Sequence, residues 1–122
     1  MISICIPIYN FHVVDLIITI INQGEGSKKP YEVICIDDGS NKETLKLNAE
    51  INSHNAVKYL ILKKNIGRSK IRNLFLENAN YENLLFIDCD CSIQSENFLE
   101  NYFEQLDNAV AVSYTHLRAH ET

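Results

Sequence analysis

Two aspartates spaced two apart, Asp88 and Asp90, directly follow an apolar run that ends in Phe86 and Ile87. If the backbone there is extended, the two side chains point to the same side, so both carboxylates can reach one cation. Mg²⁺ and Mn²⁺ prefer carboxylate oxygens and commonly share them with substrate phosphates. The pair therefore predicts a divalent-metal site. A pair of solvated loop aspartates is the alternative, because the D-x-D pattern is common by chance.

A second acidic pair, Asp37 and Asp38, ends another apolar run and is followed by Gly39 and Ser40. Adjacent strand residues face opposite ways, so the two carboxylates should have different tasks. One can accept a hydrogen bond from a base or ribose, and the other can fix the turn or approach the metal. Gly39 permits a positive φ, and Ser40 forms a capping box with Glu43. The alternative is a strand–turn–helix junction with no ligand.

Three cations, Arg68, Lys70 and Arg72, fall in the first turns of a predicted helix that begins near Gly67. Cations at a helix N-terminus oppose the helix dipole at a small cost. Their presence favours an anion site in which the dipole and the cations act together. A solvated basic face is the alternative.

Along the chain, apolar residues alternate between a strand-like and a helix-like pattern. These patterns predict the strands and helices that position the acidic and basic residues. Short continuous apolar runs are typical of buried strands, and i, i+3, i+4 spacing is typical of helices. Strict alternation predicts an α/β, Rossmann-like fold with a mainly parallel sheet and right-handed crossovers. The predicted strands are 2–7, 31–36, 57–62 and 84–88, and the predicted helices cover 14–21 (ended by Gly24 and Gly26), 41–51, 67–79 and 98–106.

The composition limits the classes of function. The chain has 122 residues, 46% of them hydrophobic and 22% charged, as expected of one globular domain or a piece of one. The net charge of −5 argues against a nucleic-acid partner. No apolar run is long enough for a membrane span, and the N-terminus has no basic region of a signal peptide. We therefore expect a cytoplasmic location.

Four cysteines, Cys5, Cys35, Cys89 and Cys91, are expected to be reduced, because nothing indicates secretion. Cys89 and Cys91 could be half of a zinc site, but no second Cys/His pair stands at ligand spacing.

The last residues, 111–122, change abruptly in composition and have no apolar periodicity. They look like a reading-frame translation of a transposase adapter used in sequencing libraries, so we expect a non-native tail after a domain part at residues 1–110. His116 and His120 accordingly receive no role. A genuine exposed tail is the alternative.

Taken together, four ordered segments resemble the nucleotide-binding half of a family 2 glycosyltransferase with the GT-A fold. They are residues 2–10, 32–40, 65–67 with Arg72 and Asn73, and 86–90. The resemblance implies a bound nucleotide-diphosphate sugar, with a UDP-sugar favoured, and Mg²⁺ or Mn²⁺. Pro7 and Tyr9 would border the base, Asp38 would accept the base N–H, and Arg72 would face the diphosphate. The donor-binding candidates are Pro7, Tyr9, Asp37, Asp38, Arg72 and Asp88, and the metal ligands are Asp88 and Asp90.

The chain departs from the family pattern where many members have an aspartate directly after the D-x-D and this chain has Cys91. Asp90 is favoured as the principal metal ligand. By the resemblance, the general base and the site for a glycan, lipid or protein acceptor lie in a second half of the domain, so this fragment should be inactive alone. The full-length protein could associate with a membrane surface. The alternatives are a haloacid dehalogenase-type phosphatase and a non-catalytic nucleotide-binding module.

Overall fold

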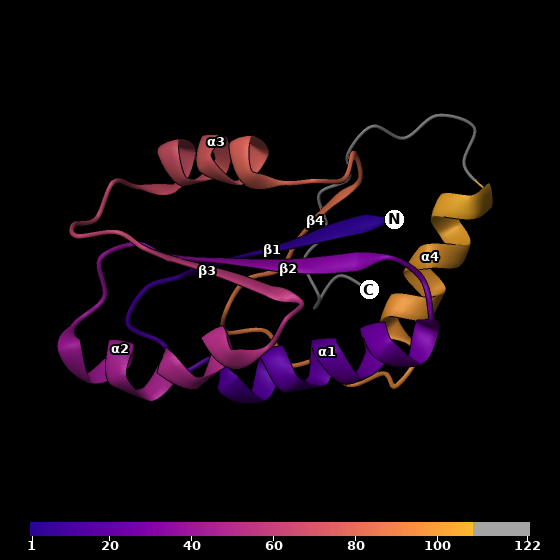
Figure 1. The fold of residues 1–122 in the computed structure, drawn as a ribbon, viewed down its shortest axis with the longest axis horizontal. Coiled ribbons are helices and arrows are strands. Elements are labelled where there is room, and N and C mark those ends of the chain that lie inside the picture. Colours follow the sequence, from indigo (N-terminus) through magenta and orange to yellow (C-terminus); the bar gives the residue numbers. More distant parts are fainter. Residues whose placement is uncertain (109–122) are drawn as a thin grey trace.

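The computed structural model describes residues 1–108, and the predicted non-native tail lies outside the described residues. Strands and helices alternate along the described chain, as the sequence predicts (Figure 1). The elements are β1 (Ile2–Ile8), α1 (Val14–Ser27), β2 (Tyr31–Asp37), α2 (Lys42–Asn48), the 3₁₀ turn η1 (Ala49–Ser53), β3 (Val57–Ile61), α3 (Arg68–Asn78), β4 (Leu84–Phe86) and α4 (Phe98–Asn108).

The four strands form one parallel sheet in the order β3-β2-β1-β4, which confirms the predicted α/β class. β1 lies in the middle of the sheet and pairs with β2 along its whole length, from Ile2 opposite Tyr31 to Ile8 opposite Asp37. The loops that leave the carboxyl ends of β1, β2 and β3 lie together at the left of Figure 1, opposite the N-terminus. In an open parallel sheet this edge is where ligands bind.

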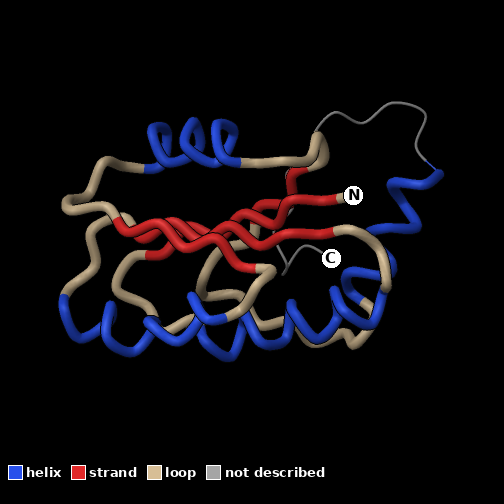
Figure 2. Tube along the Cα trace, viewed as in Figure 1, coloured by secondary structure: helices blue, strands red, loops and turns tan. Residues whose placement is uncertain are grey.

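The helices cover both faces of the sheet, with α3 on one face and α1 and α2 on the other (Figure 2). The strand order explains this arrangement. The chain moves from β1 to β2 to β3 in one direction and then returns past β1 to β4, so a right-handed crossover places α3 on the opposite face. α4 then packs beside α1.

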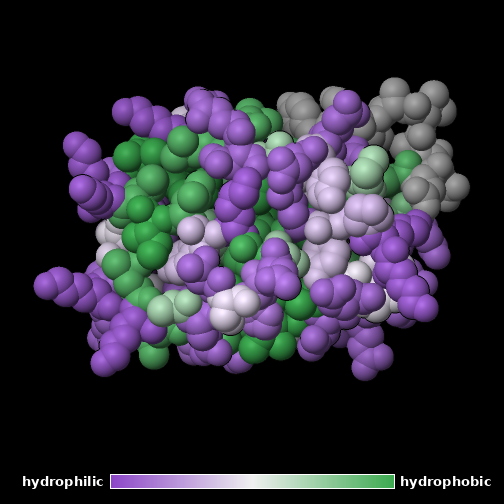
Figure 3. Space-filling model, in the orientation of Figure 1, coloured by the Kyte–Doolittle hydropathy of each residue, from purple (hydrophilic) through white to green (hydrophobic). Residues whose placement is uncertain are grey.

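The core follows from the alternation of side chains along the two central strands. Ile4, Ile6 and Val33 pack toward α1, whereas Cys5 and Ile34 pack toward α3. Each fully buried isoleucine stabilises the fold by about 2 kcal/mol relative to exposure. β3 forms an edge of the sheet, and Figure 3 shows apolar atoms gathered near where β3 leads toward α3.

Three local predictions need correction. α1 does not end at Gly24 and Gly26 but continues to Ser27. Gly24 lies inside the helix. A Cβ at this position would lie 2.5 Å from the Tyr31 ring, so a glycine here permits close packing of α1 on β2. β4 ends at Phe86, before the aspartates rather than at them.

The capping box predicted for α2 is also wrong. Asn41 caps this helix, because its side chain accepts a 2.8 Å hydrogen bond from the Thr44 amide. Ser40 instead accepts a 2.8 Å hydrogen bond from the amide of Asn10. The start of α2 is therefore tied to the loop that follows β1.

Within the described residues, no helix is long and apolar enough to cross a bilayer. The four cysteines are all free thiols, as expected. Burial raises the pKa of the Cys5 thiol to about 12, with a smaller contribution from the charge of Glu32.

Candidate functional site

A hollow of about 340 Å³ lies where the loops after β1, β2 and β4 meet the start of α3. It brings together five of the seven predicted donor- and metal-binding residues, Pro7, Tyr9, Asp38, Asp88 and Asp90. Its complete lining is Pro7, Ile8, Tyr9, Phe11, Asp38, Arg68, Ile71, Asp88, Cys89 and Asp90. We call it the β-edge hollow. One site therefore contains carboxylates, an aromatic ring and a guanidinium from segments far apart in sequence.

A smaller hollow of about 230 Å³ adjoins the first and shares Pro7, Arg68, Ile71 and Asp88 with it. Arg72 lines this second space, and its guanidinium carbon lies 5.0 Å from the centre of the Phe86 ring. A cation over an aromatic face is attracted to it, so Phe86 restricts the positions that Arg72 takes.

The basic group at the start of α3 is divided by the structure. All three side chains are exposed, but Arg68 and Arg72, four residues apart on one helix face, line the hollows, whereas Lys70 lines neither. Arg68 lines both spaces, so it is the one cation of this basic group that the two hollows share. The sequence placed Arg68 in the basic group but did not distinguish it from Lys70.

Asp38 joins the end of β2 to the start of α3. Asp38 is only 7% exposed, and its two carboxylate oxygens accept hydrogen bonds from the amides of Ile66, at 2.7 Å, and Gly67, at 3.2 Å. Its own amide donates to the carbonyl of Ile8 at 2.8 Å. A carboxylate has about four acceptor positions, so Asp38 can accept a further hydrogen bond from a ligand while keeping both backbone partners.

Asp37, the other predicted donor-binding residue of this turn, does not line either hollow. Asp37 is 0% exposed, and strand alternation places its side chain on the face of the sheet that Cys35 shares with α1, opposite the face of Ile36. One carboxylate oxygen accepts a 2.7 Å hydrogen bond from the amide of Ser40. Asp37 therefore fixes the turn, which was one of the two tasks predicted for the pair.

The turn between these elements requires a glycine at position 39. Gly39 has a φ of 82°, and a Cβ added to it would lie 2.6 Å from the backbone nitrogen of Asn65. The loop before α3 therefore packs directly on the backbone of this turn. That close approach places the Ile66 and Gly67 amides within reach of Asp38.

The aspartates after β4 converge by a different route from the one predicted. The backbone is not extended there; the amide of Cys91 donates a 3.1 Å hydrogen bond to the carbonyl of Asp88, which closes a turn. Asp88, Asp90 and Cys91 each contribute one potential ligand atom, and these three atoms lie within 4.8 Å of one another. We call these residues the β4-turn cluster.

The β4-turn cluster can accommodate a divalent cation. Two ligand atoms that each lie 2.0 to 2.4 Å from one ion can be up to about 4.8 Å apart, so the spread of these three atoms is compatible with a single ion. Asp90 is exposed and Asp88 is half-buried, so a cation has access from the hollow.

Two asparagines to which the sequence analysis gave no role hold the loop after β1. Asn10, with a φ of 49°, accepts a 2.8 Å hydrogen bond from the amide of Asn41 through its side chain. Asn48 is fully buried; it accepts from the amide of Val13 at 2.9 Å and donates to the carbonyl of Phe11 at 2.8 Å. Asparagine is one of the few residue types that adopt a positive φ readily, so an asparagine directly after a strand could have predicted the turn at Asn10. Nothing in the local pattern distinguished Asn48.

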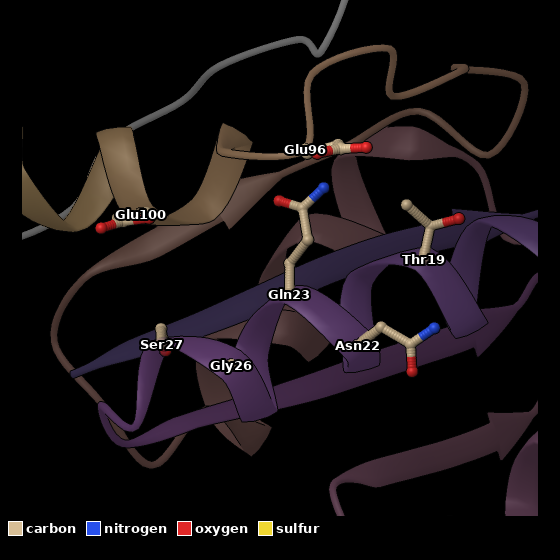
Figure 4. A pocket seen from close by; sticks show the side chains of 7 residues that line it. All are labelled: Thr19, Asn22, Gln23, Gly26, Ser27, Glu96 and Glu100. Atoms are coloured by element: carbon tan, nitrogen blue, oxygen red, sulfur yellow. The ribbon is translucent and has the colours of Figure 1, made fainter.

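A separate hollow of about 440 Å³ lies between α1 and the start of α4, and Figure 4 shows its side chains. Gln23 joins the two helices there. It donates to the carbonyl of Ser95 at 2.9 Å and accepts from the amide of Leu99 at 3.0 Å. None of the predicted site residues lines this space. Its contacts explain how α4 is held against α1.

The fold and the β-edge hollow together define a Rossmann-like α/β domain of the GT-A type. It has a parallel sheet, a crevice at the carboxyl ends of its strands, and a D-x-D turn beside that crevice. The model of the family "Glycosyl transferase family 2" matches residues 3–121. The chain therefore belongs to glycosyl transferase family 2, as its motifs suggested.

Curated relatives are also glycosyltransferases. An uncharacterized glycosyltransferase of Rickettsia conorii is 34% identical over 73% of this chain and 14% of its own length. An uncharacterized glycosyltransferase of Haemophilus influenzae is 29% identical over 93% of this chain and 46% of its own length. The chondroitin synthase of Pasteurella multocida is 29% identical over 90% of this chain and 12% of its own length. The chain thus spans less than half the length of these relatives.

Solved structures give the same fold. S. aureus TarS (residues 1–349) superposes with a TM-score of 0.65 and 28% identity, over 87% of this chain and 32% of that one. The mannosyltransferase PcManGT of Pyrobaculum calidifontis, in complex with GDP-Man and Mn²⁺, superposes with a TM-score of 0.68 and 21% identity. That match covers 90% of this chain and 33% of the other, so the described chain is an incomplete GT-A domain.

Proposed function

We propose that residues 1–110 are the donor-binding part of a glycosyltransferase that transfers a sugar from a nucleotide-diphosphate sugar to an acceptor hydroxyl. The observation that supports this most directly is the β-edge hollow. It combines two aspartates of a D-x-D turn, a guanidinium at a helix start and an aromatic side chain in one space. A nucleoside diphosphate with a divalent cation is the ligand that such a combination fits.

The proposed roles follow the position of each side chain. Tyr9, which is 53% exposed, and Pro7 would border the base at the end of β1. Asp38 would accept the base N–H through an acceptor position that its two backbone partners leave open. Arg68 and Arg72 would face the diphosphate, because a guanidinium can bind phosphate through two hydrogen bonds.

Asp88 and Asp90 would hold Mg²⁺ or Mn²⁺. When bound, the cation would supply charge stabilisation for the departing nucleoside diphosphate. Support for a metal comes from the ligand geometry of the β4-turn cluster and from the mannosyltransferase PcManGT, whose structure is a complex with Mn²⁺. PcManGT is in complex with GDP-Man. Our proposal that this chain prefers a UDP-sugar is therefore tested by titration with both nucleotides.

The acceptor would be a glycan, a lipid or a protein, and its general base would come from the part of the relatives that this chain does not span. We propose that the complete protein acts in the cytoplasm, with peripheral contact to a membrane where the acceptor is a lipid. Family membership favours this reading over a haloacid dehalogenase-type phosphatase. The phosphatase reading also leaves the Asp38 contacts without a purpose.

Calorimetric titration of the 122-residue chain with UDP and with GDP, each with and without Mn²⁺, tests the proposal. We expect UDP to bind more tightly than GDP, and Mn²⁺ to strengthen UDP binding. Asp90→Ala should remove the effect of Mn²⁺, because a diphosphate beside an unneutralised carboxylate is repelled. If neither nucleotide binds in Mn²⁺, the donor assignment is wrong.

Asp38→Asn provides the matched comparison. It should weaken uridine binding with or without metal, because the partner of Asp38 is the base rather than the diphosphate. Circular dichroism of each variant checks that a loss of binding is not a loss of fold. Assay of the full-length protein for transfer from a sugar nucleotide separates an enzyme from a non-catalytic nucleotide-binding module.

A further inference from the structure

Donor binding does not explain why Cys91 belongs to the β4-turn cluster. Its sulfur lies within 4.8 Å of a carboxylate oxygen from both Asp88 and Asp90. The turn that joins the Cys91 amide to the Asp88 carbonyl, at 3.1 Å, fixes this arrangement through the backbone. The three potential ligand atoms therefore converge without any long-range rearrangement.

Within the β4-turn cluster, Cys91 lies on the side of the hydrophobic core. It is half-buried, packs against the core that includes α1 and α4, and is not among the residues that line the β-edge hollow. Asp88 and Asp90 do line that hollow. A cation between them would have carboxylate oxygens toward the ligand and sulfur toward the core.

The neighbouring Cys89 makes the comparison specific. Cys89 is also half-buried and packs against the same core, and it lines the hollow directly. Its sulfur is nevertheless not a member of the ligand group, because the turn directs the side chains of positions 88, 90 and 91 together. The two cysteines of this turn are thus alike in chemistry and burial but differ in position, because only the sulfur of Cys91 lies beside the two carboxylates.

We propose that Cys91 is a sulfur ligand of the cation held by Asp88 and Asp90, and that it gives this site a preference for softer divalent ions over Mg²⁺. The inference rests on the proposed function only in placing a cation at these two aspartates. Thiolates favour Zn²⁺ and related soft ions, whereas sites made only of oxygens suit Mg²⁺. On binding, the metal replaces the thiol proton, which is released to solvent.

Titration of the 122-residue chain with Cd²⁺, followed by ultraviolet absorption, tests the sulfur ligand without any activity assay. A cadmium–thiolate bond gives a charge-transfer band that carboxylates cannot give. We expect the band in the parent chain and in Cys89→Ser, and its loss in Cys91→Ser. A band of equal size in Cys91→Ser would overturn the proposal.

Competition shows whether sulfur and carboxylates share one ion. Excess Mn²⁺ should reduce the cadmium band, and Asp90→Ala should weaken Cd²⁺ binding by at least about tenfold, since loss even of an outer-shell partner of a metal ligand typically has an effect of this order. If the band persists unchanged under both conditions, the cysteine binds Cd²⁺ apart from the aspartates and the proposal fails.

Cys91→Asp tests the selectivity directly, because it makes the cluster all-oxygen. The variant should bind Mg²⁺ more tightly than the parent chain and should lack the cadmium band. An unchanged ratio of Mg²⁺ to Cd²⁺ affinity would count against sulfur ligation. UDP titration in Mn²⁺ on the same samples keeps the two proposals apart, because donor binding can succeed when the sulfur assignment fails.

Discussion

The two acidic turns of this protein contain similar residues in opposite environments. At the end of β2, Asp37 is 0% exposed and Asp38 is 7% exposed, and both accept hydrogen bonds from backbone amides. At the end of β4, Asp88 is half-buried and Asp90 is exposed. The first turn joins β1, β2 and the loop before α3, whereas the second borders open space in the β-edge hollow.

This difference separates two uses of a carboxylate at a strand end. A buried carboxylate is stable when backbone N–H groups surround it, and it then positions the chain. An exposed carboxylate is well hydrated without such partners, so it can exchange water for a cation. We therefore expect substitutions in the β2 turn to affect stability most, and substitutions in the β4 turn to affect ligand binding most.

The largest expected effect on stability is that of Asp38→Ala. It removes the acceptor of the Ile66 and Gly67 amides, so we expect the free energy of unfolding to fall by about 2 to 3 kcal/mol. Urea denaturation followed by circular dichroism measures this. Asp15→Ala is the control, because Asp15 is an exposed aspartate in the first turn of α1 and should contribute about 0.5 kcal/mol. Equal losses for the two variants would mean that the backbone contacts of Asp38 stabilise the fold no more than an exposed carboxylate does.

Gly39→Ala should have the next largest effect. Its φ of 82° disfavours alanine, and the new Cβ would meet the Asn65 backbone nitrogen at 2.6 Å. We expect a loss of about 2 kcal/mol in the free energy of unfolding. Gly26→Ala is the matched control: nothing lies within 4 Å of its added Cβ, and it is inside α1. That variant should be more stable than the parent by about 0.5 to 1 kcal/mol, and a loss of stability there would contradict the packing described.

The sequence predicted the sheet well because its signals are local. The four apolar runs and the periodic segments between them depend on neighbours in the chain, and the right-handed crossover rule then restricts the topology. The sequence also placed Asp38, Asp88 and Tyr9 at strand ends, which parallel pairing brings to one edge. These predictions needed no knowledge of side-chain packing.

The parts that failed depend on contacts between distant segments. The sequence predicted different tasks for Asp37 and Asp38 but did not assign the turn to Asp37, because that depends on which face of β2 meets α3. The roles of Asn10 and Asn48 depend on loops 30 or more residues away. The convergence of Asp88 and Asp90 was predicted for the wrong reason, since a turn rather than strand alternation produces it.

A smaller effect is expected for Tyr59→Phe, which examines the enclosed side of the β2 turn. In the described part of the chain, the Tyr59 hydroxyl and the second carboxylate oxygen of Asp37 are buried without a hydrogen-bond partner. Burial, with a further contribution from the charge of Asp37, raises the pKa of Tyr59 to about 12. Removing an unpaired buried hydroxyl should change the free energy of unfolding by less than about 1 kcal/mol at neutral pH.

The pH dependence gives Tyr59→Phe a distinctive readout. The unfolded chain ionises its tyrosines near an ordinary pKa of about 10, whereas Tyr59 keeps its proton in the folded state to about pH 12. The contribution of Tyr59 to stability is therefore complete below pH 10 and is lost as the pH rises from 10 to 12. Denaturation across this range should show a shallower loss in Tyr59→Phe than in the parent. Identical slopes would mean that the turn is open to water on this side.

The smallest expected effect on stability is that of Asp90→Ala, in the exposed turn. The backbone of Asp88 and Cys91 closes this turn, so the side chain of Asp90 is not needed to form it. We therefore expect the free energy of unfolding to change by less than about 0.5 kcal/mol. The same variant should lose the strengthening of UDP binding by Mn²⁺. At Asp90 the expected effect on metal-dependent binding is therefore large and the effect on stability small, whereas at Asp38 a large effect on stability is expected.

Asp90→Asn makes this last comparison sharper, because it keeps the size and polarity of the side chain and removes only the charge. If charge holds the cation, Asp90→Asn should resemble Asp90→Ala in metal binding and the parent chain in stability. Paired measurements of urea denaturation and Mn²⁺ titration on one preparation decide this. A stability loss as large as that of Asp38→Ala would show that the β4 turn also depends on its carboxylate for folding. The contrast between a carboxylate that positions the chain and one that binds a ligand would then not hold in this protein.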